Sequence, residues 1–222
     1  MHYDVATKRL MEIGGAAVLR AVAGLDVQDI SALDELPQEQ ATIMRNDYFA
    51  LATLAEGGQT ILLVEFQAVW RAEKLLDMVI YAAQRMRRHA LPVKQIMLLF
   101  KESGEASERF ARDGLTFEFL LVKMWELDCA LLLNPAHPAL WPLAPLAKDG
   151  LASAEKVDRL LHTSDLPSRE RSDLLTIFAI FLGMRSKETA KEFIRKRREL
   201  MGTSGNTKHP KEAFRSLKNG PN

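Results

Sequence analysis

Two short apolar runs separated by a pair of glycines constrain the fold of this chain more than any other feature. Residues 48–54 read YFALATL and residues 61–67 read ILLVEFQ, with Gly57 and Gly58 between them. Apolar runs of this length that are bounded by glycine are typical of buried strands joined by a tight connection. The two runs are therefore predicted to be antiparallel neighbours in a sheet.

The second run carries polar residues at a place where burial should exclude them. Because side chains alternate between the two faces of a strand, Glu65 and Gln67 share one face and Phe66 points to the other. An ionised carboxylate is costly to bury unless it is paired or bound to a cation. Asp47 precedes the first run, and in an antiparallel pair it would lie near Glu65. The two carboxylates predict a divalent-metal site with oxygen ligands.

Structural roles stay open for the same residues. Glu65 could pair with an arginine, and Asp47 could be a turn residue beside Asn46. Gln67 could hydrogen-bond to the neighbouring backbone. Residue type alone does not choose between these roles and a metal site.

Composition excludes several classes of protein. The chain has 222 residues and a single cysteine, Cys129, so an internal disulfide and a cysteine-based metal cluster are excluded. The five histidines are scattered without the spacing of a zinc site. The N-terminal residues lack the apolar core of a signal peptide, and no apolar run approaches the roughly twenty residues that span a membrane. We therefore expect a cytoplasmic protein that does not enter a membrane.

Changes of periodicity along the chain predict its organisation. Helical spacing of apolar residues predicts helices at residues 4–23, 71–89, 152–161, 168–183 and 187–201. Gly14 and Gly15 are expected to weaken or break the first helix. Further strands are predicted at residues 93–100 and 115–123. Strands that alternate with helices predict an α/β or α+β core in residues 1–150, followed by a helical region in residues 151–201.

The helix predicted at residues 71–89 combines an apolar stripe with a basic end. The stripe consists of Leu75, Met78, Val79, Ala82 and Met86. The basic residues of its last turns are Arg85, Arg87, Arg88 and His89. Their simplest role is to complement the negative end of the helix dipole.

Positive charge is concentrated towards the C-terminus. The formal net charge is +1, yet residues 185–218 contain eleven Lys and Arg against four Asp and Glu. Residues 202–222 are rich in Gly, Pro, Asn and Lys, which predicts a basic and flexible tail. The alternative is that the basic segment attracts a polyanion such as DNA by releasing its counterions.

The order of these elements and four local motifs resemble the Rpn family of recombination-promoting nucleases and transposase-like proteins, within the PD-(D/E)XK nuclease superfamily. The resemblance spans about residues 3–147 and rests on the order and spacing of its motifs. These are Tyr3-Asp4 with Lys8, Asp47 with Glu65-Phe66-Gln67, Tyr81, and MWEL at residues 124–127 followed by LAPL at residues 143–146.

The resemblance implies a fold, a cofactor and an activity. The fold is a restriction-endonuclease-like core in which helices flank a central mixed β-sheet. The cofactor is Mg²⁺, or Mn²⁺ in its place, held by Asp47, Glu65 and the backbone carbonyl of Phe66. Gln67 would help to position the attacking water. The implied activity is hydrolysis of phosphodiester bonds in DNA, linked to recombination or transposition.

Departures from the family pattern concern positive charge. Gln67 stands where the superfamily usually has lysine, so one electrostatic contribution to the transition state is missing unless Lys74 or a basic helix residue replaces it. Asp77 occupies a position at which many relatives have arginine. These departures leave a second hypothesis open, in which a weak or inactive nuclease-fold module binds DNA or a protein partner. A third is an accessory protein of transposition that acts only in a complex.

Three further residues have a weaker connection with the site. Asp4 and Glu12 in the first helix are candidates for an additional acidic group, although Asp4 also fits an N-cap. Tyr81 matches a family position, but core packing is the favoured role because it lies beside the apolar stripe. The oligomeric state is open, and a homodimer is one alternative.

Overall fold

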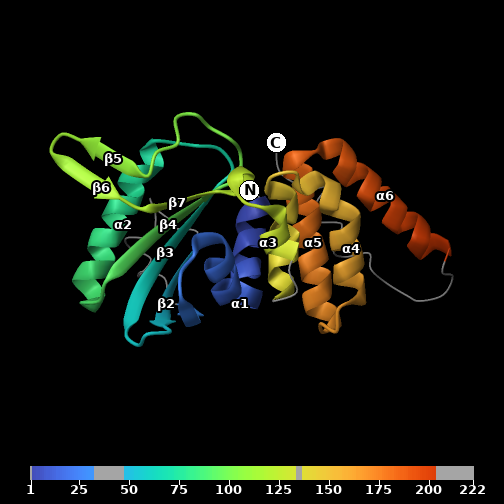
Figure 1. Ribbon diagram of the computed structural model, residues 1–222, viewed down its shortest axis with the longest axis horizontal. Coiled ribbons are helices and arrows are strands. Elements are labelled where there is room, and N and C mark those ends of the chain that lie inside the picture. Colours follow the sequence, from blue (N-terminus) through green and yellow to red (C-terminus); the bar gives the residue numbers. More distant parts are fainter. Residues whose placement is uncertain (1, 33–47, 134–136, 204–222) are drawn as a thin grey trace.

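The computed structural model describes residues 2–32, 48–133 and 137–203. A β-sheet with one helix on each face occupies one half of the molecule, and a helical region occupies the other (Figure 1). The strands are β1 (Val27–Ala32), β2 (Tyr48–Leu54), β3 (Gln59–Gln67), β4 (Val93–Leu99), β5 (Arg109–Arg112), β6 (Leu115–Glu118) and β7 (Leu120–Lys123). The α-helices are α1 (His2–Ala23), α2 (Glu73–His89), α3 (Cys129–Leu133), α4 (Ala154–Thr163), α5 (Ser168–Arg185) and α6 (Lys187–Thr203). The 3₁₀ helices are η1 (Met124–Glu126), η2 (Pro138–Leu146) and η3 (Gly150–Ser153).

The main sheet is mixed, with the strand order β1-β2-β3-β4-β7. β2 pairs antiparallel with both β1 and β3, and the β2–β3 hairpin turns at Gly57 and Gly58, which both have positive φ. β4 lies parallel to β3 and to β7. The connection from β3 to β4 passes through α2, since parallel neighbours need a crossover. The predicted hairpin, mixed sheet, flanking helices and helical C-terminal region are confirmed.

α1 covers the face of the sheet opposite to α2 and is kinked at Gly14, where φ is −156° and ψ is 33°. A Cβ atom on Gly14 would lie 2.4 Å from the Cβ of Ala139 and 2.6 Å from the Cε1 of His137. The absence of a side chain therefore lets η2 pack directly against the helix. The predicted weak point in the first helix is confirmed, and this close approach is its physical reason.

His137 is expected to make stability depend on pH. Its Nδ1 accepts a hydrogen bond from the backbone N–H of Ala139 at 3.2 Å and so caps η2. Burial lowers the pKa of His137 below the ordinary value of 6.5, Arg20 lowers it further, and Glu170 opposes them. Because His137 has a lower pKa in the folded state than in the unfolded state, the neutral imidazole stabilises the fold. This contribution to stability is complete above pH 6.5 and is lost as the pH falls. Protonation of Nδ1 also removes the cap.

Thermal unfolding between pH 7.5 and pH 5 measures this effect. We expect the melting temperature of the wild-type protein to fall more than that of His137→Asn, because asparagine can cap a helix without titrating. Equal falls in the two proteins would show that His137 does not contribute.

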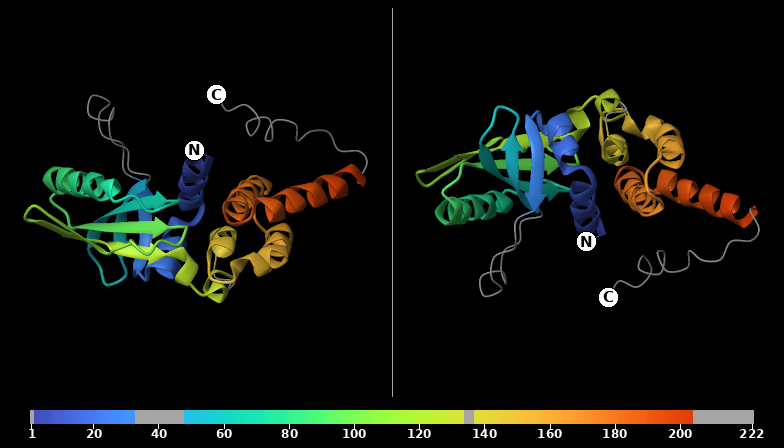
Figure 2. Two further views of the ribbon diagram at one scale, coloured as in Figure 1. Left: turned by 90° about the horizontal axis from the view of Figure 1, so that it is seen from above. Right: turned by 90° about the horizontal axis from the view of Figure 1, so that it is seen from below.

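One apolar cluster joins the sheet to the C-terminal helices. It runs from α1 and the inner face of the sheet through η2 to α5. At its centre the rings of Phe100 and Phe181 meet edge to face, with centroids 5.5 Å apart. The helical region is therefore packed on the core, which Figure 2 shows from two directions. The domain boundary placed near Gly150 stays a prediction.

Three expectations about local structure were wrong. Residues 115–123 form two strands instead of one, because Asp113 and Gly114 (φ 51° and 81°) turn a separate β5–β6 hairpin, while β7 joins the main sheet. Strand β1 lies between α1 and β2, where no strand was predicted. The buried side of α2 also differs from the predicted apolar stripe. Met86 of that stripe is 52% exposed, whereas Tyr81 and Arg85, which lie outside it, are buried.

Other predicted elements agree with the structure to within a few residues. These are the helices at residues 71–89, 152–161, 168–183 and 187–201 and the strand at residues 93–100. Among the helices of the described residues, none combines the length and apolar character needed to cross a membrane. The predicted tail lies outside the described residues from residue 204 onward.

Candidate functional site

The C-terminal end of β3 holds a buried acid and a buried amide side by side. Glu65 is 4% exposed and Gln67 is 6% exposed. Both lie on the sheet face that α2 covers, as Leu63 does, while Phe66 packs into the cluster on the α1 side. Gln67 Nε2 donates a hydrogen bond to Glu65 Oε1 at 2.5 Å. The predicted burial and alternation of these side chains are confirmed.

Lys74 brings a positive charge to this pair from the first turn of α2. Its Nζ lies 3.8 Å from Glu65 Oε1 and 3.4 Å from Asp77 Oδ2. The side chain of Lys74 is 28% exposed and that of Glu65 is 5% exposed, so the ion pair joins a buried group to a partly exposed one. The three charged side chains together carry a formal charge of −1. An arrangement of this sign favours a further cation nearby.

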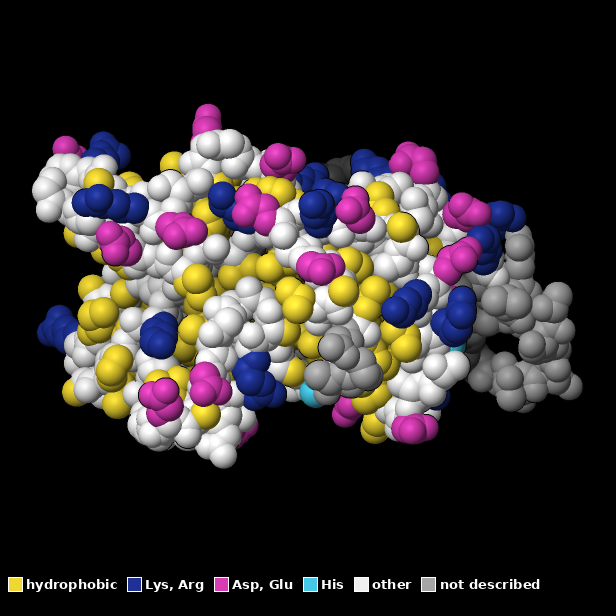
Figure 3. Space-filling model, in the orientation of Figure 1, with side chains coloured by type: hydrophobic (Ala, Val, Ile, Leu, Met, Phe, Trp, Pro, Cys, Tyr) yellow, Lys and Arg dark blue, Asp and Glu magenta, His cyan; other side chains and the backbone are white. Residues whose placement is uncertain are grey.

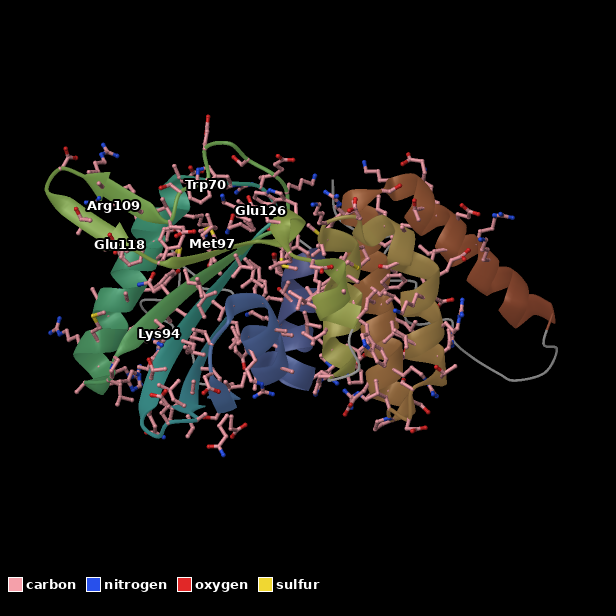
Figure 4. All side chains as sticks on the ribbon, in the orientation of Figure 1. Trp70, Lys94, Met97, Arg109, Glu118 and Glu126 are labelled. Atoms are coloured by element: carbon pink, nitrogen blue, oxygen red, sulfur yellow. The ribbon has the colours of Figure 1, made fainter. Side chains whose placement is uncertain are left out.

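The location of the site in the sheet is typical of ligand sites. β3, β4 and β7 are parallel, and Glu65 and Gln67 occupy the last residues of β3. Trp70 and Glu126 lie at this same edge, and Lys94 lies towards the other end of the sheet (Figure 4). Open α/β sheets bind ligands beyond the C-terminal ends of parallel strands.

The backbone of β3 presents the Phe66 carbonyl to the β2 side. The Gln67 carbonyl accepts a hydrogen bond from the N–H of Phe100, which directly follows β4. Successive carbonyls of a strand point in opposite directions. The Phe66 carbonyl consequently points away from β4 and towards β2. The described β2–β3 pairing ends with Tyr48 opposite Val64, before it reaches Phe66.

Asp47, the other predicted metal ligand, lies outside the described residues. Tyr48, the next residue, begins β2. Burial raises the pKa of Tyr48, and the charge of Glu12 raises it further, so Glu12 is close to the start of this strand. The carboxylate of Glu12 pairs with Arg9 at 2.8 Å, and Arg9 also pairs with Asp173 of α5.

Asp4 and Glu12 lie on α1 and therefore approach the sheet from the face opposite to Glu65. The start of α1 is nevertheless at the same edge, since the ring of Tyr3 lies 6.3 Å from that of Phe100. The structure thus brings Glu65, Gln67 and Lys74 together. It places Asp4 and Glu12 across the sheet from them.

Tyr81 packs against Ile61 and Leu63 in a small cluster between α2 and the sheet. It is 6% exposed, in agreement with the packing role considered for it. Sequence reasoning missed Arg85, one turn further along α2, which is 4% exposed. Arg85 follows Leu75 by ten residues, a spacing that places both on the buried side of the helix and could have identified it. It was missed because arginine is ordinarily assigned to the surface.

The chemistry of the donors fits a hard divalent cation. In the described part of the chain, no three Asp, Glu, His or Cys residues converge on one point. The edge does offer the carboxylate of Glu65 and the amide oxygen of Gln67, and Mg²⁺ is commonly held by one or two carboxylates with water in the other positions. Figure 3 shows acidic and basic side chains interspersed on one face of the molecule, without a single continuous basic surface.

Comparisons of the chain with models of protein families, with curated proteins and with solved structures find no match. The resemblance to the Rpn family therefore stays a prediction.

Proposed function

We propose that this chain is a Mg²⁺-dependent DNA endonuclease with a restriction-endonuclease-like core, of the type found in the Rpn family. Mn²⁺ is the alternative ion, and the proposed setting is cytoplasmic DNA recombination or transposition. The observation that carries the proposal is the carboxylate of Glu65, 4% exposed, at the C-terminal ends of parallel strands beside Lys74. A buried carboxylate in a polar cluster of this kind is a candidate for function, because it costs free energy that a structural role alone need not spend.

In this proposal each residue has a separate role. Glu65, Asp47 and the Phe66 carbonyl are the metal ligands. When bound, Mg²⁺ would lower the pKa of a coordinated water and stabilise negative charge on the scissile phosphate. Gln67 uses its N–H to hold Glu65 in place, which leaves its amide oxygen as an acceptor for a water.

Lys74 supplies the positive charge that Gln67 lacks. Its ammonium group lies at the same carboxylate, although it comes from α2 and not from β3. An ammonium group fixed near a developing phosphate charge stabilises the transition state most effectively in a site that excludes water. The replacement of lysine by glutamine in the strand is thereby compensated from the helix.

Nicking of supercoiled plasmid DNA by the purified protein tests the proposal. We expect nicking that requires Mg²⁺ or Mn²⁺ and that is lost in both Asp47→Ala and Glu65→Ala. Equal nicking by all three proteins would identify a contaminating nuclease and refute the enzymatic function.

Replacing Lys74 by methionine separates its electrostatic role from its packing role. We expect Lys74→Met to lower the single-turnover nicking rate by on the order of 10²-fold, since one preorganised charge contributes roughly that much to catalysis. Lys94→Met, at an exposed position towards the other end of the sheet, is the matched control and should leave the rate unchanged. If Lys74→Met nicks as fast as the wild-type protein, the lysine is only a counter-ion for Glu65.

A specific observation also favours the second hypothesis. Glu65 already receives a hydrogen bond from Gln67 and an ion pair from Lys74, so the cluster can be a structural network within a non-catalytic module. Such a module would bind DNA or a protein partner, as a monomer or a homodimer. Retention of duplex DNA without metal-dependent nicking, measured by gel shift at low and high salt, would support it.

A further inference from the structure

α2 carries a buried arginine on the side that faces β2 and β3. Arg85 is 4% exposed, and its Cζ lies 3.9 Å from the centroid of the Phe49 ring. Burial lowers the pKa of Arg85 below the ordinary value for arginine, and the charge of Arg88 lowers it further. Both effects show that the guanidinium group sits in an environment that opposes its charge.

No anion of the described chain compensates Arg85. Within residues 2–32, 48–133 and 137–203, its guanidinium group makes no ion pair or hydrogen bond. The ring face of Phe49 offsets part of the cost of burying the charge. The N–H donors of the guanidinium fork still require acceptors, and their geometry matches two oxygens of a phosphate or carboxylate.

Arg85 lies under the same helix as the proposed catalytic edge. Phe49 pairs with Leu63 in the β2–β3 ladder, and Glu65 is two residues further along β3 on the same face. Side chains in this diagonal relation are separated by roughly 7–8 Å. Along α2, Lys74, Tyr81 and Arg85 recur at spacings that place them on one side of the helix. Arg85 is eleven residues, or roughly 16 Å, further along α2 than Lys74, so it lies under the same helix but further from Glu65 than Lys74 does.

Arg88 is the exposed neighbour of Arg85 on α2. It is exposed one turn further along α2, where residues three apart are neighbours. Two guanidinium groups this close repel one another, as the effect of Arg88 on the pKa of Arg85 shows. An anion shared by the two groups would replace that repulsion with attraction.

We propose that Arg85 and Arg88 bind one backbone phosphate of the DNA substrate, with Phe49 fixing the plane of the Arg85 guanidinium. The inference rests on the proposed function, because it assigns the anion to the strand that Glu65 would serve to cleave. It adds a substrate contact that lies outside the metal ligands. Phosphate is the favoured anion because its oxygens accept both arms of an arginine fork.

Fluorescence polarisation of a labelled DNA duplex in EDTA tests this contact without cleavage. We expect Arg85→Met to bind about fivefold or more weakly than the wild-type protein near 0.1 M salt, and to lower the slope of log affinity against log salt by about one. Arg87→Met is the matched control, since Arg87 is exposed and two residues from Arg85 on the helix. It should retain the wild-type slope and affinity.

Unchanged slope and affinity in Arg85→Met would overturn the inference, as would the absence of any DNA binding by the wild-type protein. If Arg85→Met does not fold, Arg85→Lys replaces it. That variant keeps the charge and should keep the slope while binding several-fold more weakly, because lysine cannot form the fork; wild-type affinity in Arg85→Lys would overturn the inference. Loss of nicking in Glu65→Ala with unchanged binding in Arg85→Met would sustain the nuclease function and refute this contact alone.

Discussion

Glu65→Gln is expected to lower Mg²⁺-dependent nicking by about 100-fold or more while leaving the melting temperature unchanged or higher. The carboxylate is the proposed metal ligand, and losing the charge stabilisation that a metal provides costs several kcal/mol of transition-state energy. Stability should not suffer, because glutamine has nearly the same shape and removes a buried charge. Lys74 keeps its contact with Asp77, so it is not left without a counter-ion.

Glu56→Gln is the matched control for this substitution, because Glu56 is exposed in the connection between β2 and β3. It should nick at the wild-type rate. A fall in the melting temperature of Glu65→Gln without any loss of nicking would instead assign Glu65 to the structural network. Rate and stability measured on the same preparation therefore distinguish the two hypotheses directly.

Gly150→Ala is expected to destabilise the fold by about 3 kcal/mol, the upper part of the range for overpacking. Gly150 is buried where η3 follows η2, and a Cβ atom on it would lie 1.8 Å from the carbonyl oxygen of Ala144. Because the obstruction is backbone, no side chain can rotate to relieve it. For a chain of this length the melting temperature should fall by about 6–12 °C.

Gly104→Ala provides the comparison, since a Cβ atom at Gly104 meets no other atom within 4 Å. Its melting temperature should stay within a few degrees of the wild-type value. A similarly small change in Gly150→Ala would mean that η2 and η3 can separate at little cost. The close packing of these two 3₁₀ helices would then not be needed for stability.

Local structure was predicted correctly from the sequence where a single physical rule determined the conformation. Paired apolar runs around Gly57 and Gly58 predicted the β2–β3 hairpin, and the alternation within β3 predicted that Glu65 and Gln67 share a face. Gly14 predicted the kink in α1. In these cases the local pattern and the tertiary packing require the same conformation.

Prediction failed where tertiary contacts changed the role of a residue. Arg85 was assigned to the helix dipole, but the ring of Phe49 on β2, 36 positions earlier, draws it beneath the helix. Met86 took its place at the surface. The β5–β6 hairpin was missed although Asp113-Gly114 is a hairpin signal, because the apolar residues on both sides of Glu118 suggested one continuous strand.

The candidate site was predicted in part. Lys74 was named as one residue that could replace the missing strand lysine, and its Nζ lies within ion-pair distance of Glu65. Sequence spacing could not supply this distance, because it depends on how the first turn of α2 packs over β3. Asp47 lies outside the described residues, so its part in the site stays a prediction.

Mn²⁺ binding by the wild-type protein and by Glu65→Gln tests the central claim most directly. Free Mn²⁺ can be measured by electron paramagnetic resonance in the absence of DNA, independently of any cleavage. The wild-type chain should bind Mn²⁺ at a site whose affinity falls about tenfold or more in Glu65→Gln, as expected when a charged oxygen ligand is lost. Equal Mn²⁺ binding by the two proteins, or none by either, would contradict the assignment of Glu65 as a metal ligand.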